Sequence, residues 1–223
     1  MEKRKIIFGT YDTAETGLWT LASWTLSPAV YQQNLQPIPG RRRGPLDLST
    51  ALTDGEPIYD SRTLTATLES SEGTRLERKA RIDTMTNWLD GWSQKIKLPD
   101  DPTRFITGRV SVAENYNNDS HASVTVTAIC EPWRYSEAET LVELTAAATV
   151  QTVELANAGR LTVLPLLVIE GTGANILLEF GTASWALGPG SYQLPDLILP
   201  QGSSVLTYSG TGTARLTYRE AVL

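Results

Sequence analysis

The sequence has 223 residues, of which 41% are hydrophobic and 20% charged, and its formal net charge is −6. This composition is typical of a globular protein with one large domain or two small ones. The single cysteine excludes an internal disulfide. With only one cysteine and one histidine in the chain, a zinc site is improbable. No apolar run reaches the ~20 residues of a membrane span. An acidic chain with a pI near 4.9 is also poorly suited to wrapping nucleic acid, which needs many cationic contacts to phosphates.

The first 45 residues predict strands followed by a long connection. Residues 3–26 are rich in aromatic residues and in residues that favour strands, which indicates one or two strands at the start of the chain. Residues 27–45 contain four prolines and three consecutive arginines, so we expect an extended loop there. A loop of this length usually has a function, often in an interface. Arg41, Arg42 and Arg43 are therefore either a solvated stretch or charged partners for an acidic neighbour across a subunit interface.

The region from residue 61 predicts a strand and then the one convincing helix of the chain. Residues 61–69 alternate strictly between polar and apolar side chains, which is the pattern of a half-buried strand. Residues 75–91 have helical periodicity, with Thr74 as N-cap and Glu77 as its capping-box partner. We expect the helix to lay an apolar stripe on a sheet, since no second helix is available. Trp88 flanks that stripe and is expected in the core. The stripe consists of Ile82, Met85, Leu89 and Trp92, with Arg78 intruding one turn earlier.

The chain then returns to strands. Residues 95–98 predict a short strand, and the Pro-Asp-Asp-Pro sequence at 99–102 predicts a turn. Residues 104–113 and 122–130 predict a hairpin across the polar loop 116–121. Cys130 lies in the second of these strands, where a small buried hydrophobe is the expected role.

A change in composition after residue 134 predicts a second domain. Residues 1–134 carry 16 Lys/Arg and 17 Asp/Glu, whereas residues 135–223 carry 3 and 8. Short strands separated by turn residues are typical of a β-sandwich. We therefore predict a mainly β protein, with an N-terminal sheet plus one packed helix (1–134) and a C-terminal β-sandwich (135–223). The expected strands of the second domain are 161–170, 176–180, 184–187, 191–199, 203–209 and 213–219, with glycine turns at 171–173 and 210–212.

No catalytic, cofactor-binding or metal-binding constellation emerges from the sequence. The lone His121 is expected in a solvated loop, and the neighbouring serines lack the context of an activated nucleophile. Asp100 and Asp101 sit in a proline-flanked turn, so turn formation explains them better than glycoside hydrolysis. The glycine-rich stretches join strands and lack a P-loop lysine. Six tryptophans exceed what the core needs, and we expect some in domain or subunit contacts. Those candidates are Trp92, Trp133 and Trp185.

A series of short motifs resembles the distal tail protein family of long-tailed bacteriophages and prophages. The motifs follow one another over nearly the whole chain, and their order is more specific than any one of them. They are Gly44-Pro-Leu-Asp-Leu-Ser-Thr, Tyr59-Asp-Ser-Arg-Thr-Leu-Thr, Asn87-Trp-Leu-Asp-Gly, Leu98-Pro-Asp-Asp-Pro, Gly108-Arg-Val-Ser-Val, Ala128-Ile-Cys-Glu-Pro-Trp and the final segment from Ser209 to Leu223. The loop at 27–45 does not match the family pattern.

The resemblance implies a structural protein rather than an enzyme, without cofactors. Family members have an N-terminal sheet-plus-helix domain that forms a six-fold ring and a galectin-like C-terminal β-sandwich. The implied partners are five further copies of the chain, the tail tube protein, a tail-associated protein of fibre or lysin type, and a receptor-binding protein. DNA would pass through the ring only in transit, with no insertion into a membrane. The implied location is the tail tip of the virion, after synthesis and assembly in the host cytoplasm.

Two other classes of function remain open from the residues themselves. The C-terminal sandwich could bind host cell-surface glycans, which predicts an exposed Trp or Tyr with polar neighbours on one concave sheet face. A hydrolase would need an acid/base pair that the sequence does not reveal. The hub hypothesis instead predicts exposed apolar surface on the N-terminal domain.

Overall fold

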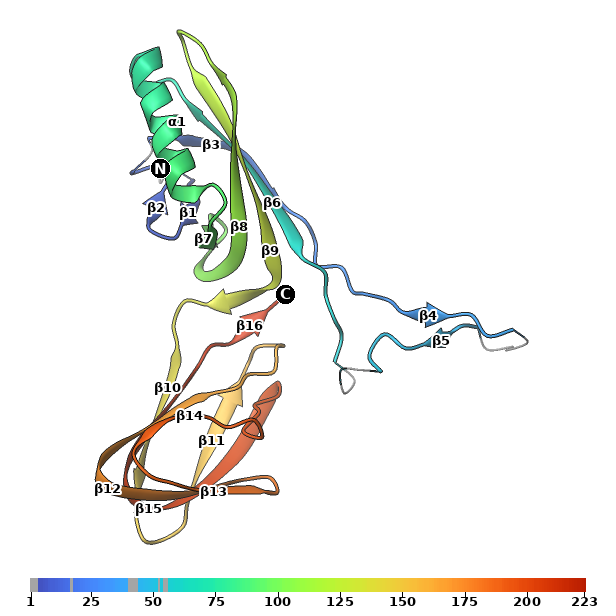
Figure 1. The fold of residues 1–223 in the computed structure, drawn as a ribbon, viewed down its shortest axis with the longest axis vertical. Coiled ribbons are helices and arrows are strands. Elements are labelled where there is room, and N and C mark those ends of the chain that lie inside the picture. The colour runs from blue at the N-terminus through green and yellow to red at the C-terminus, as the bar shows by residue number, and fades with distance from the viewer. Residues whose placement is uncertain (1–3, 17, 40–43, 52, 54–55) are drawn as a thin grey trace. The chain divides into compact units, whose positions relative to one another are not determined.

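The computed structural model describes residues 4–16, 18–39, 44–51, 53 and 56–223. The chain forms two compact units, unit 1 (Met1–Arg134) and unit 2 (Tyr135–Leu223). Strands dominate both, and one helix, α1, lies among the described residues of unit 1 (Figure 1). The predicted mainly β class with one packed helix is confirmed. No helix in the described part of the chain combines the length and the hydropathy that a membrane crossing requires.

Unit 1 is built around an antiparallel sheet in the order β2-β1-β7-β8-β9-β6-β3. A separate two-stranded ribbon pairs β4 with β5. The elements are β1 (Ile7–Phe8), β2 (Tyr11–Asp12), β3 (Thr20–Leu26), β4 (Leu35–Gln36), β5 (Leu46–Asp47), β6 (Arg62–Ser70), α1 (Arg75–Leu89), β7 (Ser93–Leu98), β8 (Asp101–Asn117) and β9 (Ala122–Ser136).

The core of unit 1 lies between the sheet and α1. The alternation predicted for residues 61–69 is present in β6, where Leu64, Ala66 and Leu68 are fully buried. The buried side chains of α1 belong to the same cluster, so the helix covers this face of the sheet. The members from α1 are Ile82, Met85 and Leu89. Cys130 is 1% exposed and belongs to the cluster too, as the sequence predicts.

Two features of unit 1 differ from the sequence prediction. The Glu-Pro-Trp sequence at 131–133 was expected to end the pattern, but β9 continues to Ser136. The connection at 27–45 was expected to lack regular structure, yet β4 and β5 pair within and just beyond it. Two residues per strand are too few to give a period-two pattern, so the sequence could not reveal them.

Unit 2 is a sheet in the order β10-β15-β12-β13, with β11 also paired to β15 and β14 also paired to β12. Its buried residues form a separate, mostly leucine core. The elements are β10 (Thr140–Ala146), β11 (Gln151–Asn157), β12 (Leu166–Phe180), β13 (Ala183–Leu187), β14 (Gly190–Gln193), β15 (Gly202–Tyr218) and β16 (Ala221–Val222).

The long strands β12 and β15 make unit 2 a sandwich by passing from one layer to the other. One half of β15 pairs with β10 and the other half with β11. Likewise β12 pairs with β14 along its first half and with β13 along its second half. Strands that switch layers at a bend or bulge are a known way of closing a sandwich, and the β12–β15 register shifts between Glu170 and Asn175.

The glycine turns predicted at 171–173 and 210–212 are wrong, and so is the omission of β10 and β11. Residues 171–173 and 210–212 lie inside β12 and β15, at the bends. In β15 glycine is needed for a close approach to β12, whereas Gly171 and Gly173 of β12 have open space around them and a positive φ that favours glycine. A Cβ on Gly210, whose φ is +120°, would lie 2.1 Å from the carbonyl oxygen of Asn175. Glycine thus marks a bulge between two paired strands where the sequence suggested a strand end.

Candidate subunit interface

An arm leaves unit 1 between β3 and β6 and carries the β4–β5 ribbon (Figure 1). Its base is fixed by backbone hydrogen bonds, with Gln32 N–H donating to Ile58 O and Asp60 N–H donating to Val30 O, both at 2.9 Å. Aromatic contacts continue inward from the base. The rings of Tyr31 and Tyr59 are 6.1 Å apart, and those of Tyr59 and Trp133 are 5.5 Å apart. The arm is therefore anchored at its root.

The arm exposes aliphatic side chains that its own ribbon does not cover. Val30, Leu35, Ile38 and Ile58 are each between 41% and 54% exposed. An isolated two-stranded ribbon is marginally stable in water, and exposed apolar surface of this kind commonly marks an interaction site. The arm is thus a candidate contact surface. The arginines proposed for the subunit interface, Arg41, Arg42 and Arg43, lie outside the described residues, so their role stays a prediction.

Helix α1 begins as the sequence predicts. The Thr74 side chain accepts a hydrogen bond from Glu77 N–H, and the Glu77 carboxylate accepts one from Thr74 N–H, which is a complete capping box. These hydrogen bonds from Thr74 hold the pKa of Glu77 below its ordinary value. Asp90 follows the last helical residue in an extended conformation, with its N–H donating to Thr86 O at 2.9 Å.

The intruding Arg78 is buried, at 1% exposed, and ties the start of α1 to the turn between β8 and β9. Its guanidinium donates to the carbonyl oxygens of Gly73, Asn118 and Asp119, the last at 3.0 Å. A buried charge is tolerable only when hydrogen bonds replace its hydration. Here backbone carbonyls take that role, and the hairpin turn is held against the helix.

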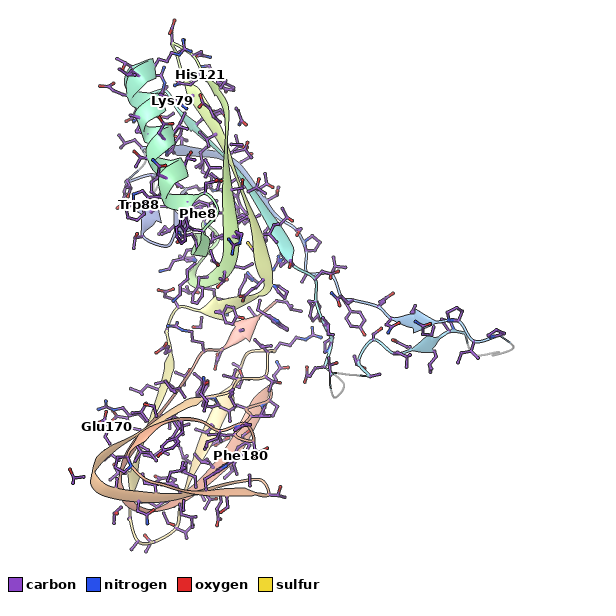
Figure 2. All side chains as sticks on the ribbon, in the orientation of Figure 1. Phe8, Lys79, Trp88, His121, Glu170 and Phe180 are labelled. Carbon is purple, nitrogen blue, oxygen red and sulfur yellow. The ribbon has the colours of Figure 1, made fainter. Side chains whose placement is uncertain are left out.

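The two tryptophans near the end of α1 are exposed, which corrects one sequence prediction. Trp88 was expected in the core but is 56% exposed, near the C-terminal end of α1 (Figure 2). Trp92, assigned to the buried stripe, is 65% exposed because the helix ends at Leu89 and the chain turns before it. Leu76, at 79% exposed, lies on the helix too. The exposed side of α1, with Leu76 in its first turn and the tryptophans at its end, is a second candidate contact surface.

The residues weighed for catalysis lie apart. His121 is exposed at the end of the β8–β9 hairpin, where its ring stacks edge-on against Tyr116 at 5.1 Å (Figure 2). Asp101 is bound by Arg104 and Arg134, at 3.3 and 3.2 Å, instead of facing a second carboxylate. Within the described residues, no group of three or more His, Cys, Asp or Glu side chains could hold a metal ion. The chemistry of these side chains is structural.

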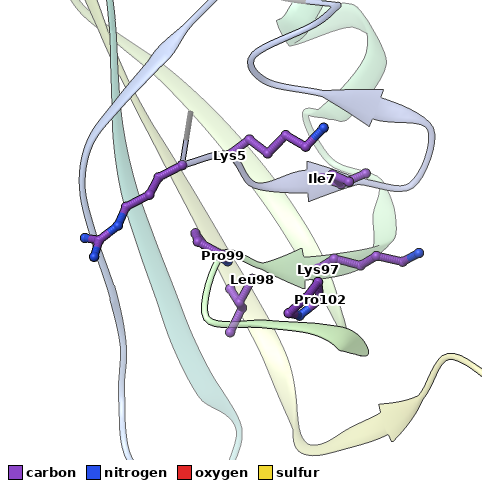
Figure 3. A pocket seen from close by; sticks show the side chains of 7 residues that line it. Lys5, Ile7, Lys97, Leu98, Pro99 and Pro102 are labelled. Atoms are coloured by element: carbon purple, nitrogen blue, oxygen red, sulfur yellow. The ribbon is translucent and has the colours of Figure 1, made fainter. Parts of the chain in front are cut away.

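The described residues of unit 1 line shallow hollows, two of which are near charged side chains. One, of about 320 Å³, is lined by Ile7, Leu98, Pro99, Pro102 and three cations, and in Figure 3 Lys5 and Lys97 extend to the same side of it. Lys5 lies 2.7 Å from Asp12 and 2.8 Å from Glu15, whose hydrogen bonds raise its pKa above the ordinary value. The other hollow, of about 420 Å³, is bordered by Leu76 and by the Lys79–Glu114 ion pair. Lys5 in the first hollow and Lys79 in the second are thus already paired with carboxylates.

Unit 2, all of whose residues the structure describes, exposes aliphatic side chains but keeps its aromatic ones at least partly covered. Trp185, Tyr192 and Tyr208 pack against the core, and the Tyr192 hydroxyl donates to Gly188 O at 3.1 Å. An exposed Trp or Tyr, the feature that the glycan-binding alternative predicts, is not found on this unit. That alternative rests on fold analogy alone.

Comparisons with known proteins give one informative result. No protein-family model matches the sequence, and no curated protein matches it either. The structure is similar to the crystal structure of the SPP1 Dit (gp 19.1) protein, described as a paradigm of the hub adsorption apparatus in phages that infect Gram-positive bacteria. The similarity has a TM-score of 0.70 at 16% identity and covers 100% of both chains. The chain therefore has the fold of a phage Dit protein, as the motif order predicts.

Proposed function

We propose that this protein is a structural, non-enzymatic hub of a phage adsorption apparatus, located at the tail tip of the virion. The observation that carries the proposal is the similarity in fold to the SPP1 Dit protein over the full length of both chains. Fold alone does not fix function, because one fold can serve many roles. Support must therefore also come from the surface of this chain.

The surface of unit 1 supplies that support. Its arm and α1 expose aliphatic and tryptophan side chains, the residue types that are enriched in the buried centre of interfaces. A closed ring requires each copy to present two different, complementary surfaces, one for each neighbour. Unit 1 carries two such surfaces, the arm and the exposed side of α1. This is what a ring-forming subunit would display before assembly.

In the proposed assembly, six copies form a ring through unit 1. The tail tube protein lies on one side, and a tail-associated protein of fibre or lysin type lies on the other. A receptor-binding protein can attach to unit 2. The ring opening lets DNA pass without binding it.

The sheet face opposite α1 suits such an opening. Thr65 pairs across the sheet with Thr127, and Thr67 pairs with Thr125. Because successive side chains of a strand alternate, these four hydroxyl groups lie on the face opposite the buried Leu64, Ala66 and Leu68. On β6 and β9 these uncharged hydroxyl groups give phosphates no cations to bind, and the cations Lys95 and Arg109 of the same face lie on β7 and β8.

The native mass in solution tests the proposal. Light scattering behind a sizing column should give about six times the 24.4 kDa of one chain, and negative-stain images of the peak should show a ring with an open centre. A protein that remains a monomer, even when mixed with the tail tube and tail-associated proteins, would contradict the proposal.

The arginines of the arm offer a sharper test of the ring contact. Replacing Arg41, Arg42 and Arg43 by Ser should weaken assembly and leave the circular dichroism of the chain unchanged. A control that replaces Lys95, Arg160 and Arg215 by Ser has the same net charge but should assemble normally. If both variants assemble like the parent protein, the three arginines have no role in the ring.

A further inference from the structure

One edge of β8 has no strand beside it near the end of the strand. β7 pairs with β8 only as far as Arg109, whereas β8 continues to Asn117. The N–H of Val112 points to this edge, because it donates to the carboxylate of Asp90, which precedes β7. Backbone groups of alternate residues point to the same edge, so the N–H and the carbonyl of Glu114 lie on it too. Among the described residues, β8 pairs only with β7 and β9, so this edge is available to a further strand.

A hollow of about 420 Å³ lies between this end of β8 and the start of α1. It is lined by Arg75, Leu76 and Lys79 of the helix and by Glu114 and Asn117 of the strand. The Lys79 amino group lies 2.8 Å from the Glu114 carboxylate, and the Asn117 side-chain amide donates to Arg75 O at 3.0 Å. These contacts hold α1 beside β8 (Figure 1). A site whose walls are fixed before binding loses little entropy when a partner arrives.

The charge of the hollow favours an acidic partner. Residues 72–81 contain four basic and two acidic residues. Lys79 is already paired with two carboxylates, whereas the exposed Arg75 takes part in no ion pair within the part of the chain that the structure describes. A carboxylate suits a guanidinium best, because it can accept two parallel hydrogen bonds from it. Beside Arg75, the side chain of Leu76 is 79% exposed and offers an apolar contact.

An extended segment of a partner protein is the occupant that fits the edge, the charge and the apolar contact together. Only an extended backbone can pair with the N–H and the carbonyl of a strand edge, which is how many domains add a peptide to a sheet. In such a segment, side chains two positions apart point to the same side. An acidic and an aliphatic residue at that spacing therefore face Arg75 and Leu76 together, because both line the hollow from α1.

We propose that an extended segment of a partner protein, with an acidic and an aliphatic residue two positions apart, adds as a strand to the edge of β8 at Glu114. Its carboxylate binds Arg75, and its aliphatic side chain packs on Leu76. The inference goes beyond the proposed hub role, since it assigns a binding site at the opposite end of α1 from the tryptophans.

Peptide binding to the full chain tests the site. The probe is the labelled peptide Thr-Glu-Thr-Val-Thr-Glu-Thr, whose side chains have the same order in both strand directions, and fluorescence anisotropy measures its affinity. Its dissociation constant should be below about 1 mM, and weaker binding overturns the proposal. The version with lysine in place of glutamate should bind at least about tenfold more weakly. Arg75→Glu should weaken binding of the glutamate peptide by a similar factor, and it retains the fold because glutamate is favourable in the first turn of a helix. The matched control is Lys95→Glu, the same change of charge on the sheet face opposite α1, where the effect should stay below about twofold because salt screens distant charges.

Backbone methylation and hydrogen exchange test the strand pairing itself. A peptide that adds to one edge uses the N–H groups of only one set of alternate residues. Of two N-methylated peptides, one methylated on valine and the other on the two central threonines, one should bind at least about fivefold more weakly and the other like the parent peptide. Amide exchange at Glu114 should be fast in the free chain and slow with the peptide bound. Slow exchange in the free chain would show that another segment or a second copy already covers the edge, and it would overturn the proposal. Equal losses for the two methylated peptides, or equal effects of Arg75→Glu and Lys95→Glu, would overturn it as well.

Discussion

Unit 1 exposes two tryptophans and a proline-bearing arm, whereas unit 2 keeps its tryptophan and tyrosines at least partly buried. The units also differ in charge, since unit 2 carries 3 basic and 8 acidic residues while unit 1 is nearly balanced. A nearly neutral surface with exposed aromatic side chains suits tight association between subunits. An acidic surface with scattered aliphatic side chains keeps a domain soluble at the outside of an assembly.

Each unit also contains a buried polar side chain that binds backbone carbonyls. In unit 1, Arg78 attaches the start of α1 to the β8–β9 turn. In unit 2, the Asn157 amide donates to Leu161 O and Leu199 O, both at 3.0 Å. The Asn157 side-chain oxygen also accepts from Gly159 N–H at 3.0 Å, so each of the two side chains has three backbone partners. Because hydrogen bonds made by a charged group are the stronger ones, unit 1 depends more strongly on its buried polar group. The following predictions test the two units against each other.

The largest effect is expected for Arg78→Ala. Removing the guanidinium leaves buried carbonyls without donors and opens a cavity, so unit 1 should lose about 4 kcal/mol of unfolding free energy. Urea unfolding in a Trp185→Phe background measures it, because the remaining five tryptophans all lie in unit 1. The control is Arg75→Ala, an exposed position on the same helix, where the loss should stay below about 0.5 kcal/mol. Equal losses for the two variants would show that Arg78 does not hold the turn.

A smaller but sharper contrast is expected between Leu89→Ala and Trp88→Ala. Leu89 is fully buried, so its truncation should lower the unfolding free energy of unit 1 by about 3 kcal/mol. Trp88 is the larger side chain, but more than half of it is already in water, so Trp88→Ala should lower the unfolding free energy of unit 1 by less than about 1 kcal/mol. The same urea experiment compares them as monomers. A loss above about 2 kcal/mol for Trp88→Ala would restore the core position that the sequence suggested.

The Trp88 case illustrates what periodicity can and cannot predict. The stripe of Ile82, Met85 and Leu89 was predicted correctly, because a 3.6-residue period reports the buried face of one helix. A residue beside the stripe is buried only if the neighbouring strands reach that far, which depends on the sheet and not on the helix sequence. The capping box at Thr74 was also predictable, since both of its partners are local.

The arm and unit 2 mark the limits of prediction from sequence. The strands β4 and β5 have two residues each, which is too few to show an alternation of polar and apolar side chains. Their ribbon is stabilised by the anchored base of the arm. In unit 2, the sequence predicted turns at glycines of β15 that instead allow its backbone to approach β12 closely, a contact between residues far apart in the chain. The order of family-like motifs predicted the fold where these local signals failed. The exposure of Trp88 and Trp92 could not be predicted, because it depends on where α1 ends and on how far the sheet extends beneath it.

Alkaline pH should distinguish the two units through Cys130. Burial raises the pKa of this thiol to about 11, so the folded chain keeps its proton where the unfolded chain loses it. Stability is therefore lost as pH rises from the ordinary pKa toward the folded one, by about 1 kcal/mol between pH 9 and pH 10. The comparison of parent protein and Cys130→Ala isolates this loss, because all other titrating groups are shared. If the stability of unit 1 depends on pH in the same way in the parent protein and in Cys130→Ala, the prediction is wrong. The stability of unit 2 should have the same pH dependence in the two proteins.

Tyr218→Phe should produce the smallest effect, confined to unit 2. The Tyr218 hydroxyl donates to Ala156 O at 2.6 Å, and the side chain is 5% exposed. Losing this donor leaves a carbonyl in a partly buried position, which lowers the stability of unit 2 by about 1 kcal/mol. Burial also raises the pKa of Tyr218, so the neutral phenol is favoured in the fold and its contribution fades at strongly alkaline pH. Hydrogen exchange followed by peptide mass should show faster exchange in β11 and β15 and unchanged exchange in α1 and β6. Faster exchange in unit 1 as well would mean that the two units unfold together. A substitution in one unit would then change the stability of the other.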